Sequence, residues 1–130
     1  MKNIILTLLL LIGLVSCNSE DSKLKYSYSV NSDGMIRREM KVKNPVSDIE
    51  IEMEGEATFN TDKTAITGIT KDGYIKYRDR KKELEIINEN GKAVVSLQEN
   101  GQSISVTSDT GKELIADAAR QVNKLQNKKK

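Results

Sequence analysis

Three glutamates alternate with apolar residues in one short segment, at Glu50, Glu52 and Glu54. Alternate side chains of an extended strand point to one face about 6.5 to 7 Å apart, so these carboxylates could contribute ligands to a calcium ion. Calcium takes about six to eight converging oxygens, which a straight row does not supply. The simpler hypothesis is that the row faces water and pairs with basic residues of the preceding segment, namely Arg37, Lys41 and Lys43.

A second group of residues could bind an anion. It consists of Lys76, Arg78, Arg80, Lys81 and Lys82, with Tyr74 and Tyr77 interleaved. Cations beside aromatic rings can neutralise and stack on an anionic chain such as a polysaccharide or a lipid headgroup. Basic residues at a hairpin tip also keep edge strands from pairing with other chains. The sequence leaves both interpretations open and favours the solvated hairpin tip.

The chain lacks the residues that many catalytic and metal sites require. The chain has no histidine and one cysteine, Cys17, which excludes zinc sites built on cysteine and histidine and also serine–histidine triads. No glycine-framed or paired-acid motif for hydrolysis is present. With 21 basic and 19 acidic side chains, no strong field favours nucleic acid. We therefore expect no enzymatic activity, no cofactor, no metal site and no nucleic-acid partner.

The N-terminal segment has the layout of an export signal. Lys2 supplies the positive charge, and the apolar run over residues 4–15 is too short for a membrane span of about twenty residues. The Leu-Val-Ser-Cys sequence at residues 14–17 closes this run and resembles the lipobox of bacterial lipoproteins. The resemblance implies cleavage before Cys17, a diacylglyceryl group on its thiol and fatty acylation (palmitate) of its new amine. The alternative, an uncleaved cytoplasmic helix, leaves the abrupt change to polar residues at Asn18 unexplained.

The chain divides into four parts. We expect residues 1–16 to be a lipoprotein signal peptide, 17–23 a lipidated flexible tether, 24–127 a single domain and 128–130 a basic tail. The acidic, serine-rich start of the tether is similar to export tags of surface lipoproteins in the Bacteroidota, and it is also typical of any flexible linker. We expect a lipid-anchored protein of the bacterial cell envelope, at the outer membrane, on either its periplasmic or its surface-exposed face.

Alternation of apolar and polar side chains dominates the expected domain, which predicts half-buried strands. These lie at 24–30, 36–43, 49–54, 57–59, 64–69, 74–78, 83–87, 93–98 and 103–107. Strong hairpin signals separate several of them, at Asp33-Gly34, Asp72-Gly73, Asn90-Gly91 and Asn100-Gly101. The predicted fold class is α+β, an antiparallel β-meander of about 7–9 strands with one C-terminal amphipathic helix.

A helix is predicted near the end of the chain, where the spacing of apolar residues changes from that of a strand to that of a helix. One helical stripe contains Leu114, Ile115, Ala118, Ala119, Val122 and Leu125. This predicts a helix from Thr110 to about Leu125, with a capping box formed by Thr110 and Glu113. The lysines at 128–130 suit the negative end of a helix dipole and a solvated tail, and binding to anionic lipid is the alternative.

One helix is too narrow to cover such a sheet. About eight strands at roughly 4.8 Å spacing span about 40 Å, whereas a helix covers about 10 to 12 Å. Either the sheet curls around the helix, or part of its apolar face stays open for a partner or an acyl chain. The clean alternation over residues 49–54 favours a dry core around Ile51, with one buried and one wet face.

Part of the domain resembles a short extracytoplasmic domain of uncharacterised bacterial secreted proteins. Four segments carry the resemblance in order, GEATF at 55–59, ITGI at 66–69, DGYIKY at 72–77 and ELEI at 83–86. In some relatives the domain adjoins BlaR-type membrane peptidases. The resemblance implies an order of strands with a closing helix, and it transfers no activity and no binding residue.

These features favour a binding or accessory interaction module anchored by lipid at the cell envelope. Its expected partners are the membrane, through the anchor, and an envelope protein, a polysaccharide or a lipid. The alternative function is a carrier or sensor of a lipid or other apolar ligand held in a curved antiparallel sheet. A pocket lined by apolar residues would favour the carrier, and a closed core with a charged exterior would favour the interaction module.

The first prediction concerns processing at Cys17. Mass spectrometry of the protein purified from bacterial membranes should find Cys17 as an acylated N-terminus, because the lipobox directs cleavage before it. Cys17→Ala should release or misprocess the protein. Recovery of an intact Met1 terminus from the soluble cytoplasm would contradict the prediction.

Overall fold

The computed structural model describes residues 23–128, so the predicted lipobox and Cys17 lie outside the described residues. The strands are β1 (Lys23–Val30), β2 (Ile36–Lys43), β3 (Asp48–Glu54), β4 (Ala57–Phe59), β5 (Ile66–Ile69), β6 (Tyr74–Asp79), β7 (Lys82–Glu89), β8 (Lys92–Glu99) and β9 (Gln102–Ser103). One helix follows, α2 (Asp109–Asn127). The predicted fold class, an antiparallel α+β meander with a C-terminal helix, is confirmed.

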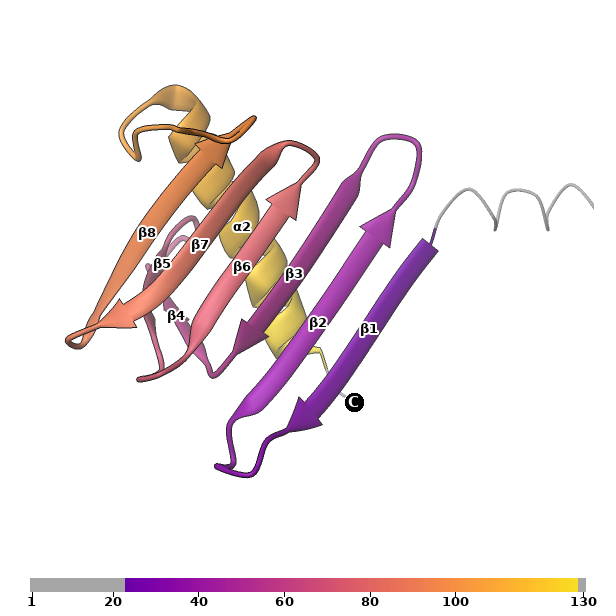
Figure 1. Ribbon diagram of the computed structural model, residues 1–130, viewed down its shortest axis with the longest axis vertical. Helices are drawn as coiled ribbons and strands as arrows, with labels where there is room; N and C mark the ends of the chain where they lie inside the picture. Colours follow the sequence, from indigo (N-terminus) through magenta and orange to yellow (C-terminus); the bar gives the residue numbers. More distant parts are fainter. Residues whose placement is uncertain (1–22, 129–130) are drawn as a thin grey trace, which may run out of the picture.

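Seven strands form one antiparallel sheet in the order β1-β2-β3-β6-β7-β8-β9, and β4 and β5 pair separately. The chain leaves the sheet after β3, makes the β4–β5 hairpin and returns as β6 beside β3. Figure 1 shows this hairpin and α2 on the same side of the large sheet. The face that one helix could not cover is therefore shared between a helix and a hairpin.

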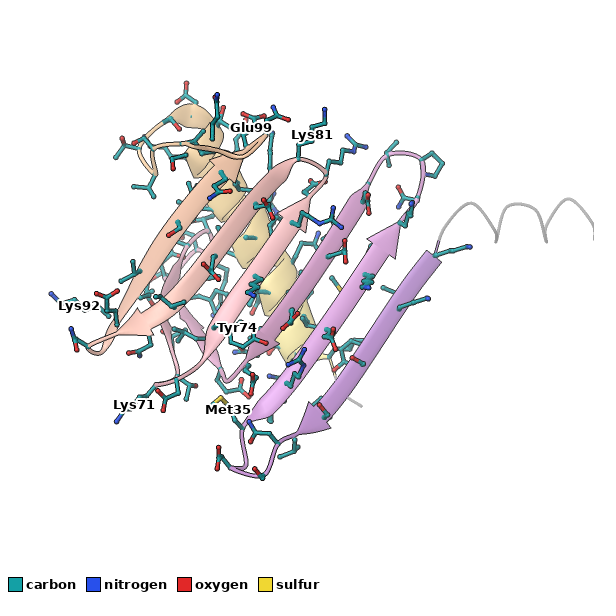
Figure 2. All side chains as sticks on the ribbon, viewed as in Figure 1. Met35, Lys71, Tyr74, Lys81, Lys92 and Glu99 are labelled. Carbon is teal, nitrogen blue, oxygen red and sulfur yellow. The ribbon has the colours of Figure 1, made fainter. Side chains whose placement is uncertain are left out.

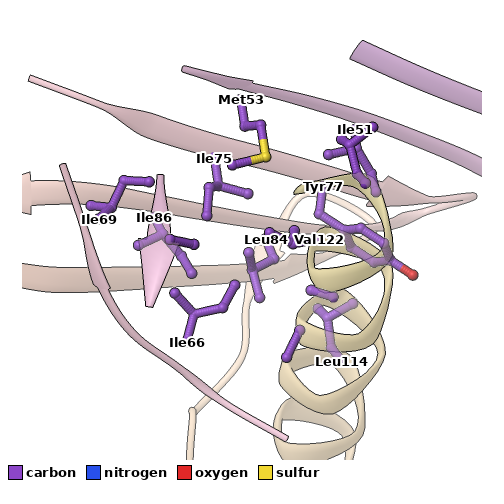
Figure 3. Packing of buried hydrophobic residues seen from close by; sticks show 14 of the residues in the cluster. Ile51, Met53, Ile66, Ile69, Ile75, Tyr77, Leu84, Ile86, Leu114 and Val122 are labelled. Carbon is purple, nitrogen blue, oxygen red and sulfur yellow. The ribbon is translucent and has the colours of Figure 1, made fainter. Parts of the chain in front are cut away.

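Register decides which side chains enter the core. The pairing of β3 with β6 places Ile51 opposite Tyr77 and Met53 opposite Ile75, and these four side chains are at most 2% exposed. Leu84 and Ile86 of β7 extend the same face, and Leu114 and Val122 of α2 pack against it (Figure 3). The expectation that Ile51 belongs to a closed core is thus met by the geometry.

A side-chain amide joins the helix to the hairpin. The backbone N–H of Ala57 donates to Oε1 of Gln126 at 2.7 Å, and Nε2 of Gln126 donates to the carbonyl of Ala57 at 2.9 Å. Gln126 therefore pairs with β4 in the manner of a neighbouring strand. This contact ties the end of α2 to the start of the hairpin, so that the two covering elements support each other.

The tight turns follow the predicted chemistry at two of the hairpins. Asn90 and Gly91 have φ of 55° and 85°, and Asn100 and Gly101 have φ of 55° and 80°, as a two-residue type I′ turn requires. The turn between β6 and β7 contains no Asn-Gly or Asp-Gly pair. Arg80 in this turn nevertheless has a positive φ of 61°. There the backbone N–H of Arg80 donates to the carbonyl of Asp48 at 3.1 Å, which ties the turn to β3.

Two expectations for the C-terminal part were wrong. The last strand ends at Ser103 and not at Thr107, because the chain turns away toward the helix. The helix cap is Ser108 and not Thr110: the Ser108 hydroxyl accepts from the backbone N–H of Gly111 at 3.0 Å. Gly111 is buried close to the carbonyl of Ser105 and to Leu97 of β8. This close approach sets where the helix begins, and the cap lies two residues earlier than the capping-box spacing indicates.

Among the described residues, one charged side chain is buried on the apolar side of the sheet. Arg38 is 5% exposed, and its guanidinium pairs with Glu56 at 3.2 Å and lies 5.6 Å from the ring centroid of Tyr28. A buried cation without a partner is costly, so Glu56 must stay close. Arg38 therefore holds the crossing from β3 to β4 against the outer strands.

The second prediction compares two apolar residues of the same face. Ile51→Ala should lower the free energy of unfolding by about 2 to 5 kcal/mol, because it opens a cavity in a closed core. Leu24→Ala should cost less than about 1 kcal/mol, because the Leu24 side chain on β1 is 60% exposed. Urea denaturation of the full chain measures both values. A loss of under about 1 kcal/mol for Ile51→Ala would contradict a closed core.

Candidate binding face of the sheet

The surface of the large sheet that faces away from α2 is uncovered within residues 23–128. Figure 2 views the molecule from this side, with Tyr74 on the sheet and α2 behind it. We call this surface the open face. It is built by the alternate residues of four central strands, namely Arg37, Glu39 and Lys41 of β2, Glu50, Glu52 and Glu54 of β3, Tyr74, Lys76 and Arg78 of β6, and Glu83, Glu85 and Ile87 of β7.

Strand register arranges these side chains in rows of charged residues across the sheet. One row reads Lys41, Glu50, Arg78 and Glu83, and the next reads Glu39, Glu52, Lys76 and Glu85. Directly opposite residues in an antiparallel sheet lie about 4.5 to 5.5 Å apart. Each charge of the first row therefore has an opposite charge as its neighbour, whereas the second row places Glu39 opposite Glu52. With four basic and six acidic side chains among the residues named above, the open face is highly charged and carries a small net negative charge.

Ion pairs neutralise the glutamate row, as the sequence predicts. Glu52 lies 3.1 Å from Arg37, and Glu50 lies 3.6 Å from Lys41. Glu50 also pairs with Arg78 of β6, which the sequence did not indicate. Lys43 was expected to join the row but lies opposite Asp48. Within the described part of the chain, no group of acidic residues is arranged to hold a metal ion.

A half-buried corner of the open face is built by a tyrosine between opposite charges. The Tyr74 hydroxyl donates to Oε2 of Glu52, and the Arg37 guanidinium donates to the Tyr74 oxygen at 3.3 Å. Burial, followed by the hydrogen bond and the negative charge of Glu52, raises the pKa of Tyr74. The same contacts raise the pKa of Arg37, with Tyr74 as the largest cause. Tyr74 therefore remains protonated and holds Glu52 in place.

The predicted basic cluster does not form one patch. Lys76 and Arg78 lie on the open face, whereas the interleaved Tyr77 points to the opposite side and is 2% exposed. Lys76 lies between its cross-strand neighbours Glu52 and Glu85, and Arg78 is paired with Glu50.

The other three cations of the predicted cluster sit at the tip of the β6–β7 hairpin. The Arg80 guanidinium donates to the carbonyl of Val46. Lys81 is exposed in the turn, and Lys82 begins β7. The five cations are therefore divided between a neutralised sheet surface and a hairpin tip, which favours the solvated-tip interpretation.

Sequence reasoning missed a second basic group. Pairing of β1 with β2 places Lys25 opposite Lys41 and Lys23 opposite Lys43, and these four lysines border a shallow depression of about 300 Å³. Residues far apart in the sequence form it, so only the register could have revealed it. A larger depression of about 450 Å³ crosses the middle of the open face, bordered by Glu52, Lys76, Glu85 and Ser96 among others.

Comparison with known proteins identifies no family for this chain. No family model, no curated protein and no solved structure matches the chain. Within residues 23–128 no helix is long and apolar enough to cross a membrane. The site must therefore be interpreted from its own residues.

The third prediction concerns Tyr74 and pH. Because the pKa of Tyr74 is raised above the ordinary value of 10.0, its contribution to stability is complete below pH 10 and is lost as the pH rises further. Tyr74→Phe should destabilise the protein at pH 7, and the difference from the wild type should narrow above about pH 10. Urea denaturation across this pH range measures the difference. A constant difference would contradict the assigned hydrogen bond to Glu52.

Proposed function

We propose that this protein is a lipid-anchored interaction module of the bacterial cell envelope, and that it binds a partner protein through the open face. One observation carries the proposal: the apolar face of the sheet is filled by α2 and the β4–β5 hairpin, whereas the opposite face is uncovered within residues 23–128. A surface rich in charges of both signs, with a small net negative charge, gives specificity without a general attraction to polyanions. The proposal assigns no catalysis to the chain.

A carrier role has less support. A carrier needs an apolar cavity that encloses most of its ligand, but the core residues that would line one are closed, with Met53, Ile75 and Val122 each 0% exposed. The two depressions described above lie on the charged side of the sheet. The geometry thus favours the interaction module over an acyl-chain carrier.

A protein is also a better partner than a polysaccharide. Sugar chains are commonly held by aromatic rings, and on the open face as defined above Tyr74 is the aromatic residue. Nζ of Lys76 lies 5.7 Å from the centroid of the Tyr74 ring, and the Tyr74 hydroxyl donates a hydrogen bond to Glu52. A protein surface can instead match these rows of charged residues with complementary charges of its own. Ile87 and Val94, each more than a third exposed, add an apolar contact at one end.

The proposed anchor would keep the module close to the membrane. Cys17 precedes the first residue of β1, Lys23, by only a few residues, and such a tether reaches about 20 Å when fully extended. The partner would then be a protein of the same membrane surface. We place that surface at the outer membrane, on its periplasmic or its exposed side.

The fourth prediction tests the open face in cells of the native host. A photo-cross-linking amino acid at Ser96, on this face, should capture one membrane protein that the same probe at Lys124, on the exposed side of α2, does not capture. With the partner purified, Lys76→Gln combined with Glu85→Gln should weaken binding roughly tenfold, about 1.4 kcal/mol, since both side chains are exposed and opposite each other.

The matched control removes an equal pair of charges elsewhere. Lys112→Gln with Glu113→Gln, both exposed on α2, should leave the affinity unchanged. Circular dichroism verifies that both double variants fold. Equal effects of the two double variants, or capture from Lys124 alone, would place the binding surface elsewhere. A lipid that copurifies in stoichiometric amount would favour the carrier.

A further inference from the structure

The part of the open face built by β7 and β8 differs in composition from the part built by β2, β3 and β6. Six of its side chains face each other across the two strands, Glu83 opposite Gln98, Glu85 opposite Ser96 and Ile87 opposite Val94. Two of the six are acidic, two are neutral and polar, two are apolar, and none is basic. We call these six residues the β7–β8 patch.

The two carboxylates of the patch are left without a cation. Glu83 and Glu85 lie opposite Arg78 and Lys76 of β6, but both cations have other partners. The Arg78 guanidinium pairs with a glutamate of β3, and Nζ of Lys76 lies 5.7 Å from the ring centroid of Tyr74. Within residues 23–128 neither Glu83 nor Glu85 forms an ion pair. The patch therefore presents two exposed carboxylates that a partner can neutralise.

An apolar row lies beside these carboxylates. Ile87 and Val94 are directly opposite each other and are 39% and 38% exposed, and Tyr74 is the neighbour of Ile87 on its other side. The depression of about 450 Å³ described above is bordered by Glu85 and Ser96, in the next row. On a charged surface, apolar side chains are the ones that a partner can cover at little cost of desolvation.

In the mature chain proposed above, the residues outside the described part cannot reach the patch. Register places Ile87 in the same row as Ser29, four strands from β1 and six residues along from Lys23. This separation is about 28 Å, whereas the proposed tether before Lys23 reaches about 20 Å. Lys128 lies on the opposite side of the sheet, and residues 129–130 span about 7 Å.

We propose that the β7–β8 patch binds an extended segment of the partner protein in which two basic side chains and one large apolar side chain occupy alternate positions. Alternate side chains of an extended segment recur about every 6.5 to 7 Å, which matches the spacing of Glu83, Glu85 and Ile87 along β7. The basic side chains pair with the two glutamates, and the apolar one packs on Ile87 and Val94. The inference rests on the proposed binding role of the open face and adds the chemistry of its partner.

Charge selects this segment over two alternatives. An acidic segment or an anionic headgroup would set like charges against Glu83 and Glu85. A wholly apolar segment would cover the two carboxylates without pairing them, which is costly. A segment with both basic and apolar side chains satisfies each part of the patch.

Synthetic peptides test the match directly. The probe is a fluorescent, serine-rich peptide with two lysines and one leucine at alternate positions, and the control peptide has the same composition with the two lysines adjacent. Fluorescence anisotropy with the full chain in a nonionic detergent measures both dissociation constants. The alternating peptide should bind at least about tenfold more tightly. Equal affinities, no measurable binding of either peptide, or equal binding of a peptide with glutamates in place of the lysines would overturn the proposal.

Charge removal on the protein gives a second measurement. Glu83→Gln with Glu85→Gln should weaken binding of the alternating peptide about tenfold. The matched control, Asp62→Asn with Glu113→Gln, removes the same number of exposed negative charges away from the open face and should leave the affinity unchanged. The same loss in both double variants would show a general charge effect and would contradict the proposal.

The apolar row is tested in the same way. Ile87→Thr with Val94→Thr keeps the β-branched side chains that suit a strand and should weaken binding about tenfold. Val46→Thr with Val106→Thr, at residues 76% and 44% exposed, is the control and should have no effect. Circular dichroism verifies that each variant folds. Unchanged binding after the change at Ile87 and Val94 would overturn the apolar contact.

These results separate the inference from the proposed function. Capture of a membrane protein from Ser96, together with peptide binding that does not depend on the patch, would keep the open face as the binding surface and would overturn the chemistry proposed for its partner. Failure of that capture would contradict the proposed function, whereas the peptide comparison would still decide whether the patch selects alternating basic and apolar side chains.

Discussion

The structure depends on burying one face of a single antiparallel sheet. Strand alternation places the apolar side chains of β3, β6 and β7 on one side, and a sheet with an uncovered apolar face is unstable in water. Ala118 and Ala119 of α2, both 0% exposed, let the helix axis approach the sheet closely. The β4–β5 hairpin covers the part that the helix does not reach, and Gln126 joins the two through both main-chain groups of Ala57.

The positions of α2 and the β4–β5 hairpin determine which surface is open to the proposed partner. Both covering elements lie on one side, so the other side displays rows of charged residues whose order is set by the same register that forms the core. The apolar strip of β1 extends past the end of α2, which leaves Leu24 and Val30 exposed. The charged face and the exposed apolar ends of β1 are thus two consequences of one arrangement.

Much of the fold could be predicted because it depends on local pattern. Period-two alternation located the strands, and Asn-Gly pairs marked two hairpins with positive φ at both residues. The sequence did not predict that β4 and β5 pair with each other apart from the main sheet, since the pattern of a short strand does not specify which strand it pairs with. Helix capping by Ser108 was missed because it depends on the close approach of Gly111 to Ser105 and Leu97.

The site was only partly predictable for the same reason. Pairing of the glutamate row with Arg37 and Lys41 followed from adjacent strands, whereas the pair between Glu50 and Arg78 required β6 to return beside β3. Tyr77 was grouped with basic residues by sequence proximity, although neighbours in a strand face opposite ways. Arg38 breaks the apolar pattern of β2, and its partner Glu56 lies beyond the end of β3.

Two adjacent isoleucines test the one-sided architecture most directly. Ile86 and Ile87 are consecutive in β7 but are 1% and 39% exposed. In methyl NMR spectra recorded with a soluble paramagnetic agent, the Ile87 signals should broaden strongly while those of Ile86 stay almost unchanged. Equal broadening of both would mean that the apolar face is open, and equal protection of both would mean that the charged face is covered. Either result would contradict a closed core beneath a free binding face.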